Sequence, residues 1–161
     1  MLILGIDPGL NNTGWGVVRQ EGNSLSFVAG GTLKVPATLP MPERLKQIYV
    51  GLQGLLVQYQ PQAAAIEEVF VNSNPRTSLK LGQARGVAML TTAMAGLTCA
   101  EYTPSEIKKA LVGTGRADKN QVSYMIKVLL PRAVVTSPDM GDALAVAVCH
   151  AHTSLGWMPR R

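Results

Sequence analysis

The sequence predicts an α/β fold: a mixed five-stranded sheet flanked by helices. Three strand-like segments joined by short turns come first, at 2–7, 14–20 and 25–35, and this order indicates an antiparallel meander. Helical patterns then alternate with two further short strands, at 63–69 and 99–102, and this alternation favours parallel addition to the same sheet. The fold expected is therefore three antiparallel strands followed by parallel strands.

The first strand is an apolar run that ends abruptly. Leu2 to Ile6 are apolar or glycine, and Asp7 is followed by the turn formers of 8–14. Trp15, Val17 and Val18 then supply the β-forming residues of the second strand. The third strand is followed by a segment with three prolines, which predicts a loop. These prolines are Pro36, Pro40 and Pro42.

The first helix is marked by an apolar stripe that recurs at helical spacing from Leu45 to Tyr59 and stops at Pro61. A second helix is expected at about 77–95, after a polar loop, and it is rich in glycine and alanine. Glycine inside a helix costs about 1 kcal/mol relative to alanine. Close approach of another backbone, from a second subunit, would explain that cost.

The remaining helices have recognisable starts. Thr103, Pro104 and Glu106 have the residue types of an N-cap, a first-turn proline and a capping-box acid. Asp118 is suited to cap the following helix, which is expected to reach about Leu130. Residues 137–138 (Ser-Pro) open a last helix that carries Asp139 and Asp142.

The 161 residues are enough for one compact domain, expected to span 1–161. No apolar run approaches the roughly 18 residues that a membrane span needs, and the apolar start is too short for a signal peptide. We therefore expect a cytoplasmic protein with no membrane partner. Cys99 and Cys149 lack metal-ligand spacing and are expected to be buried thiols rather than a disulfide.

The net charge of +5 favours an anionic partner, most commonly nucleic acid. Nine of the 15 basic residues lie in the stretch from Arg76 to Arg132, and they are Arg76, Lys80, Arg85, Lys108, Lys109, Arg116, Lys119, Lys127 and Arg132. Solvated surface charge would give a similar composition, so charge alone decides little.

The positions of four acids are more informative. Asp7 and Glu67 each end an apolar strand, and Asp139 and Asp142 are spaced to share one face at a helix start. Gathered carboxylates repel each other, and a cation relieves this repulsion. Oxygen-rich sites suit Mg²⁺ or Mn²⁺, and two such ions about 4 Å apart support phosphodiester cleavage. The sequence thus predicts a metal centre.

Simpler explanations exist for each acid taken singly. Asp7 before Pro8 could hold a turn through its side chain. Asp139 could be a favourable charge at a helix start, and Glu67 a strand end that reaches water. The common setting of all four acids, beside apolar or alanine-rich flanks, favours the metal centre.

The same residues resemble a known family, the RuvC Holliday junction resolvases. Five segments are similar to the family's motifs and stand in its order, over nearly the whole chain. They are Leu4-Gly5-Ile6-Asp7-Pro8-Gly9-Leu10 with Thr13-Gly14-Trp15-Gly16, Ala65-Ile66-Glu67-Glu68-Val69-Phe70, Lys80-Leu81-Gly82-Gln83-Ala84-Arg85-Gly86, Gly113-Thr114-Gly115 with Ala117-Asp118-Lys119, and Asp139-Met140-Gly141-Asp142-Ala143-Leu144-Ala145.

The resemblance implies an RNase H-like fold, a homodimer, and paired nicks across a four-way junction in recombination and repair. Asp7, Glu67, Asp139 and Asp142 fall on the family's four catalytic positions, where they would bind two Mg²⁺ or Mn²⁺ ions per subunit. Some relatives carry histidine at the third of these positions, where this chain has Asp139. A junction-binding protein and a branch-migration motor are the partners that the resemblance implies.

The resemblance also implies DNA contacts. Phe70 falls on an aromatic that opens or stacks on junction bases, although a core phenylalanine is an equal alternative. Lys108 and Lys119 match basic positions that bind or stabilise the cleaved phosphate. The full set of expected DNA-binding residues is Phe70, Arg76, Lys80, Lys108, Lys109, Arg116 and Lys119. His150 could assist catalysis, but a surface or capping role is the more common use.

Three other functions compete with this hypothesis. A sugar-kinase or actin-like phosphate-binding domain opens with a similar strand and turn, but that fold needs two such domains. A related RNase H-like nuclease would act on RNA or RNA–DNA hybrids, and its substrate would suit the same basic stretch. A non-catalytic DNA-binding module would carry the acids for structural reasons only.

Overall fold

A five-stranded mixed sheet crosses the centre of the molecule. The computed structural model describes residues 1–68 and 73–154. The strand order is β3-β2-β1-β4-β5, with β1 antiparallel to β2, β2 antiparallel to β3, and β1, β4 and β5 parallel. The strands are β1 (Leu2–Asp7), β2 (Asn12–Glu21), β3 (Ser24–Lys34), β4 (Ala63–Glu67) and β5 (Cys99–Tyr102). The predicted fold class is confirmed.

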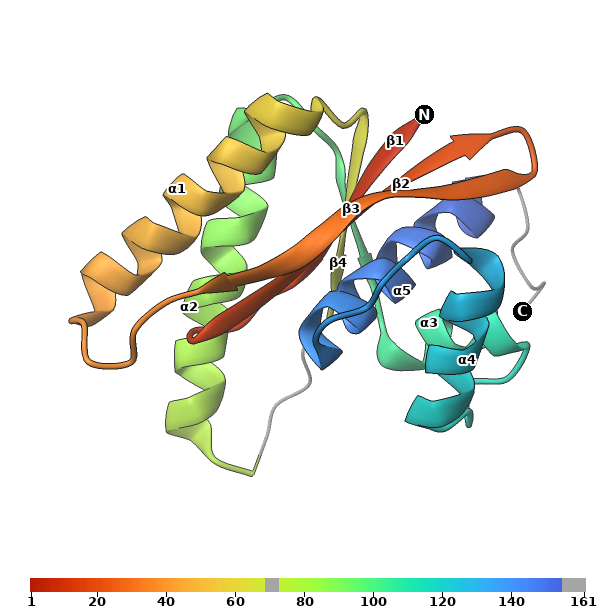
Figure 1. Ribbon diagram of the computed structural model, residues 1–161. Coiled ribbons are helices and arrows are strands. Elements are labelled where there is room, and N and C mark those ends of the chain that lie inside the picture. The colour runs from red at the N-terminus through yellow and green to blue at the C-terminus, as the bar shows by residue number, and fades with distance from the viewer. Residues whose placement is uncertain (69–72, 155–161) are drawn as a thin grey trace.

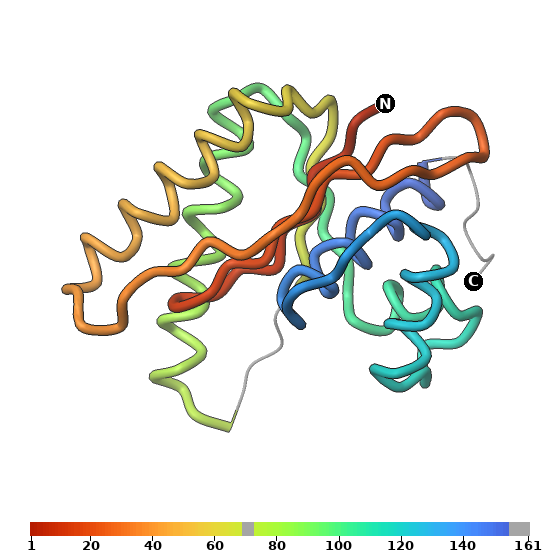
Figure 2. Tube along the Cα trace, in the orientation of Figure 1, coloured from red at the N-terminus to blue at the C-terminus, as the bar shows by residue number. Residues whose placement is uncertain are grey.

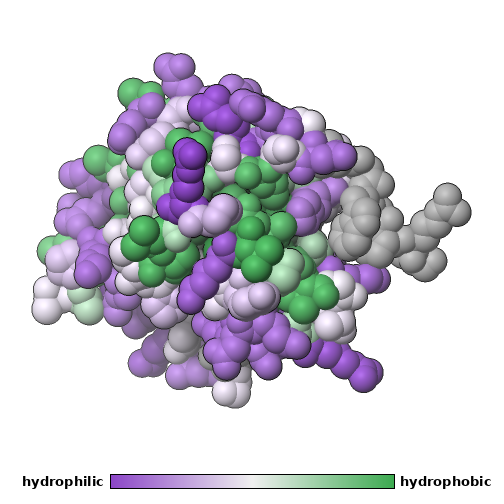
Figure 3. All heavy atoms as spheres, turned by 45° about the vertical axis from the view of Figure 1, so that its right-hand side comes forward, coloured by the Kyte–Doolittle hydropathy of each residue, from purple (hydrophilic) through white to green (hydrophobic). Residues whose placement is uncertain are grey.

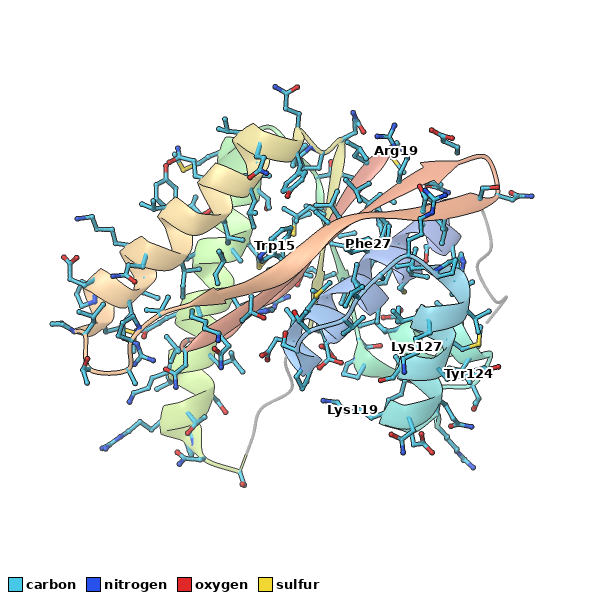
Figure 4. All side chains as sticks on the ribbon, viewed as in Figure 1. Trp15, Arg19, Phe27, Lys119, Tyr124 and Lys127 are labelled. Atoms are coloured by element: carbon cyan, nitrogen blue, oxygen red, sulfur yellow. The ribbon has the colours of Figure 1, made fainter. Side chains whose placement is uncertain are left out.

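Helices cover both faces of the sheet, so that the sheet separates two apolar cores (Figure 1). One face carries α1 (Met41–Tyr59) and α2 (Pro75–Met94), and the other carries α3 (Pro104–Val112), α4 (Lys119–Leu129) and α5 (Pro138–Ser154). Figure 4 shows Trp15 on the side of α1 and Phe27 on the side of α5. Alternating strand residues thus serve the two cores.

Most element boundaries agree with the sequence prediction, and the differences have local causes. Helix α1 begins at Met41, so Pro42 lies in its first turn, where proline is tolerated, rather than in the loop. Helix α2 begins at Pro75 because the Asn74 side chain accepts hydrogen bonds from the next two available backbone N–H groups. Arg76 is therefore helical. The predicted end of the fourth strand, Val69, lies outside the described residues, and β4 ends at Glu67.

Helix α5 packs against the sheet at van der Waals distance, because the strands beneath it lack side chains at three points. A methyl group added at Gly5 would overlap the main chain of α5 at Ala143, and one added at Gly14 would overlap the main chain at Asp139. At Gly16 it would overlap the Leu144 side chain. The strand glycines thus set the distance between the sheet and the helix that carries two of the acids.

Side-chain hydrogen bonds fix α5 at both ends. Ser137 Oγ accepts from the backbone N–H of Met140 and lies 2.7 Å from Thr32 Oγ1 of β3, so the helix start is tied to the sheet. At the other end, the buried Gln20 of β2 donates through Nε2 to the carbonyl oxygen of Ala151 at 2.9 Å. The helix therefore cannot slide along the sheet without breaking bonds at either end.

The glycines of α2 behave differently from those under α5. At Gly82 and Gly86, no atom of the described residues lies within 4 Å of the position that a Cβ would take. The close backbone approach expected for this helix is therefore not made by the described part of the chain itself. These glycines are exposed, on the outer face of the layer formed by α1 and α2. Figure 2 shows the backbone of this layer.

Two further expectations concern the cysteines and the membrane. Cys99 and Cys149 are free thiols, as predicted, and Cys149 is buried while Cys99 is half-buried. None of the helices in the described part of the chain is long and apolar enough to cross a membrane.

Candidate metal centre and nucleic-acid interface

The four predicted acids meet at one edge of the sheet. Because β1 and β4 are parallel neighbours, with Ile6 opposite Ile66, their last residues Asp7 and Glu67 leave the sheet side by side. Asp139 and Asp142 lie in the first turns of α5, which crosses β1 and β4 at this edge. All four side chains are partly buried. The structure therefore brings together the acids that the sequence selected.

The electrostatics of Asp7 show that these groups share one local field. Burial is the largest cause that raises its pKa, followed by the negative charges of Asp142, Glu67 and Asp139. The positive charge of Lys119 acts in the opposite direction. Together these effects raise the pKa of Asp7 from 3.8 to about 8. Burial and the neighbouring acids thus disfavour the negatively charged form of Asp7, and a bound cation would stabilise that form.

Glu67 lies between the acids and two lysines. Burial and the charge of Asp142 raise its pKa, while Lys119 and Lys108 lower it. Lys119 Nζ lies 3.4 Å from Asp142 Oδ2, and Figure 4 shows Lys119 at the start of α4, beside the start of α5. Both lysines implied by the family resemblance therefore stand at the acidic centre.

The donor set fits a hard divalent cation, but its side chains are not arranged for coordination. Among residues 1–68 and 73–154, no three acidic, histidine or cysteine side chains converge on one point closely enough to hold a metal ion. The carboxylates are near enough to raise the pKa of Asp7, and oxygen donors are those that Mg²⁺ and Mn²⁺ prefer. The residue types and the closeness of their negative charges suit a divalent metal ion. Coordination requires the carboxylates to turn toward one another.

Arg85 of α2 holds the strand end that carries Glu67. Its Nε donates to the main-chain carbonyl oxygen of Glu67 at 3.3 Å, and its guanidinium forms an ion pair with Glu101 of β5. One side chain thus links α2, β4 and β5 at the edge where the acids gather. Arg85 lies in one of the family-like segments, but its sequence context alone predicts no role for it.

Two hollows flank the acids. One, of about 220 Å³, is lined by Glu67, Asp142, Lys108 and Lys119, among others. The second, of about 430 Å³, lies on the Asp139 side, and its lining includes Asn11, Asn12, Arg44, Thr77, Lys80 and Asp139. Basic side chains therefore stand on both sides of the carboxylates, as a polyanion lying across this edge would require.

A third groove, of about 470 Å³, runs between α4 and the start of α5 and shares Lys119 and Asp142 with the first hollow. Lys127 of α4 also lines it, together with apolar residues such as Val135 (Figure 4). On the face turned forward in Figure 3, hydrophobic side chains gather near the middle and hydrophilic ones surround them. The groove itself offers both charge and apolar contact next to Asp142.

The other predicted DNA contacts are more scattered. Lys80 lines the hollow beside Asp139. Arg76, Lys109 and Arg116 are exposed but line none of the three hollows. Phe70 lies outside the described residues, so its two alternative roles stay predictions.

His150 is directed to another part of the molecule. Its Nδ1 lies 2.8 Å from the hydroxyl oxygen of Tyr102 in β5, and the two rings meet edge to face. Burial lowers the pKa of His150. The histidine thus links α5 to β5 rather than lying among the acids.

Arg44 is a residue of the site that sequence reasoning missed. It lies on the buried face of α1 together with Ile48 and Leu52, and it lines the hollow that contains Asp139. A pattern was available, because Arg44 precedes Ile48 by one helical turn and so continues the apolar stripe with a charge.

Comparison with known proteins places the chain among nucleases. A sequence model described as "Crossover junction endodeoxyribonuclease RuvC" matches residues 3–150. A protein of that name from Rhodopseudomonas palustris is 56% identical over 150 residues, which is 93% of this chain and 86% of the relative. One from Rhodospirillum rubrum is 52% identical over 156 residues, 97% of this chain and 92% of the relative.

Solved structures of Holliday junction resolvases have the same fold as this chain. Thermus thermophilus RuvC in complex with a Holliday junction substrate superposes with a TM-score of 0.91 at 31% identity and covers 97% of this chain and 96% of its own. The yeast mitochondrial Holliday junction resolvase gives a TM-score of 0.65 at 13% identity over 96% of this chain and 81% of its own, which supports the fold alone.

The mixed sheet, with acids at its edge and on α5, defines an RNase H-like nuclease. The chain belongs to the RuvC family of crossover junction endodeoxyribonucleases, and this family is divalent-metal-dependent. The actin-like alternative is thereby excluded, and so is a purely DNA-binding module as the family's function.

Proposed function

We propose that this chain cuts four-way DNA junctions by metal-dependent hydrolysis of phosphodiester bonds, in recombination and repair. The observation that carries the proposal is the partly buried Asp7 among three further carboxylates, with basic side chains on both sides. A site that only bound DNA would gain nothing from buried acids, because they repel the phosphate backbone.

Asp7, Glu67, Asp139 and Asp142 are the residues that would hold the metal, two Mg²⁺ or Mn²⁺ ions per subunit. When bound, the ions neutralise charge, activate water and stabilise the leaving oxygen. Asp7 has the central place because the other three acids all act on its pKa. Lys119 and Lys108, which lie next to Glu67, neutralise charge that develops on the scissile phosphate.

Contacts outside the centre are proposed for the remaining basic residues. Lys80 lines a hollow next to Asp139, and Arg76 lies one helical turn before it on α2. Lys109 is exposed near the end of α3, and Arg116 is exposed just before α4 begins. Each would bind backbone phosphate and position the junction without reading its sequence. Phe70 is proposed to stack on junction bases.

Paired cutting requires two active centres, and we propose a homodimer. The support is the outer face of α2, where Gly82 and Gly86 lie with the exposed side chains of Leu79, Leu90 and Met94. These five residues fall on one stripe of the helix, at spacings of three or four. Small residues on such a stripe let a second helix approach closely, and the large ones supply apolar area.

The proposal extends to organisation and partners. Residues 1–161 would act as one nuclease domain, and the substrate, chromosomal junction DNA, would place it in the cytoplasm. A junction-binding protein and a branch-migration motor are the proposed partners by family resemblance.

The test is cleavage of a synthetic mobile four-way junction with and without Mg²⁺, beside an RNA–DNA hybrid of matched sequence. We expect symmetric nicks in the junction only with metal, and at least about a 100-fold loss of rate for Asp7→Asn. Asp118→Asn, at the cap of α4, is the matched control. Preferential cleavage of the hybrid, or full nicking by Asp7→Asn, would contradict the proposal.

A further inference from the structure

Arg44 is a buried cation without an acidic partner among the described residues. Its relative exposure is 9%, and its neighbours on the inner face of α1 are aliphatic. No described carboxylate forms an ion pair with it, although four other basic residues do form such pairs. Burying an unpaired charge is far more costly than burying an apolar side chain, so such a position calls for compensation.

The compensation within the chain is partial. The Arg44 guanidinium donates to Oδ1 of Asn11, a neutral acceptor, and its Nε is enclosed without a hydrogen-bond partner among the described residues. A guanidinium has five N–H donors in a fixed fork, and this fork matches a phosphate. The Arg44 guanidinium is therefore held in place by a neutral acceptor, and no described residue balances its positive charge.

The surroundings of Arg44 form a polar hollow that reaches the acidic centre. The hollow measures about 430 Å³ and includes Thr77 and Lys80 of α2, Asn12 at the start of β2, and Asp139 of α5. Two cations and three neutral hydrogen-bonding side chains, those of Asn11, Asn12 and Thr77, thus line one space, and the single acid among its lining residues is one of the proposed metal ligands.

The wall contributed by the β1–β2 turn is rigid. Thr13 Oγ1 donates to the carbonyl oxygen of Gly9 at 2.8 Å, and the carbonyl oxygen of Asn11 accepts from the backbone N–H of Val35 at 2.8 Å. A Cβ at Gly9 would overlap the main chain of Asn12. Figure 2 shows this turn between the ends of β1 and β2. Because the turn is fixed, Asn11 and Arg44 are presented in one arrangement before any ligand arrives.

We propose that this hollow binds a backbone phosphate of the cleaved strand, next to the scissile phosphate, and that Arg44 is its buried anion-binding residue. Lys80 covers the same phosphate from α2, and Asn12 and Thr77 supply hydrogen bonds. The occupant lies beside the metal centre because Asp139 borders both. The inference rests on the proposed function, and it adds a strand-positioning subsite on the Asp139 side.

The first test measures how junction binding depends on salt, with the full chain carrying Asp7→Asn and no divalent metal. Each phosphate contact contributes about 0.9 to the slope of log affinity against log salt concentration. We expect Arg44→Gln to reduce the slope by about 0.9 and to weaken binding at least about 10-fold. Arg44→Lys keeps the charge and should keep most of the slope.

Lys46→Gln is the matched control, because Lys46 lies on the same helix, is 69% exposed, and pairs with Glu43 rather than lining the hollow. Its slope is expected to equal that of the parent within about 0.3, a third of one phosphate contact. Equal slopes for folded Arg44→Gln and Lys46→Gln would overturn the inference.

A second experiment identifies the phosphate and does not depend on the folding of an Arg44 variant. Single methylphosphonate groups, which are neutral, replace successive phosphates of the cleaved strand. One position near the cut should cost the parent protein at least about 10-fold in affinity and cost Lys80→Gln much less, because its charge partner is already weakened. If every position costs both proteins equally, no such subsite exists.

The two failures are distinguishable. If the wild-type chain does not cut junctions with metal, the proposed function fails and this inference fails with it. If the chain cuts junctions but neither the slope nor the methylphosphonate pattern depends on Arg44 or Lys80, only the subsite is wrong.

Discussion

Helices α5 and α2 share a composition rich in small residues, yet their small residues do opposite things. Nine residues of α5 are buried, and glycines at three points of β1 and β2 let it press against the sheet. In α2 only four residues are buried, and Gly82 and Gly86 meet nothing within the described chain. A glycine therefore marks a close contact between the sheet and α5 but an open face on α2.

The two helices therefore have different roles: α5 positions acids, and α2 presents an open surface. On α5, close packing fixes where Asp139 and Asp142 stand relative to Asp7, because the strand glycines and the helix main chain touch directly. On α2, the open stripe carries no chemistry and is available to a second copy of the chain.

The contact under α5 should be intolerant of a single methyl group. In Gly14→Ala, the new Cβ would overlap the main chain at Asp139, so the start of α5 must shift. We expect a loss of about 1–3 kcal/mol in the free energy of unfolding and at least about a 100-fold loss of single-turnover cleavage. Urea titration and quenched-flow cleavage measure the two effects.

Gly54→Ala is the control for that substitution, since Gly54 is exposed on α1 and its Cβ position is empty. It should preserve cleavage and leave stability equal or slightly higher. Wild-type cleavage by Gly14→Ala would show that helix position does not govern the acids.

The open face of α2 should tolerate substitution within the monomer but not within the dimer. Gly86→Arg places a long charged side chain in the middle of the stripe, and we expect the dimer dissociation constant to rise at least about 10-fold. Sedimentation velocity at several concentrations measures it. Val128→Arg on α4, also an exposed apolar position, is the control and should leave the dimer intact. Unchanged dimers in Gly86→Arg would place the interface elsewhere.

Gly82→Ala, a smaller substitution, also tests whether the face of α2 is open in the monomer. In the monomeric Gly86→Arg background, Gly82→Ala should raise the free energy of unfolding by about 0.5–1 kcal/mol, because alanine stabilises a helix interior relative to glycine. In the wild-type background the same change should weaken the dimer. If Gly82→Ala destabilises the monomer, α2 makes an internal contact at that position.

The smallest effect concerns the far end of α5. Burial lowers the pKa of His150 below its usual value of 6.5, so the unfolded chain binds the proton more readily than the folded chain. Stability from this residue is therefore complete above about pH 6.5 and declines as the pH falls through that value. Thermal melts of Asp7→Asn protein without metal, with and without His150→Gln, measure it. An identical pH dependence in both proteins would contradict this assignment.

The sequence was most informative where local chemistry decides structure. The capping residues Thr103 and Asp118 start their helices where predicted, because a side-chain cap needs only its own neighbours. The succession of strands along the chain could also be read, and so could the positions of Asp7 and Glu67, because a charged residue that ends an apolar strand is visible without a partner. Asp139 and Asp142 were selected by their spacing at a helix start. The start of α2 was placed two residues late, since Asn74 was not recognised as its cap.

Tertiary structure alone decided what each position meets. The glycines of β1 and of α2 are the same residue type, and only packing shows that Gly5 touches α5 while Gly86 touches nothing described. Arg44 looks in the sequence like a surface charge near a helix start, but it is buried, has no acidic partner among the described residues and lines the same hollow as Asp139. Periodicity and capping are properties of neighbours along the chain, whereas contact, burial and electrostatic field depend on segments that meet only after folding.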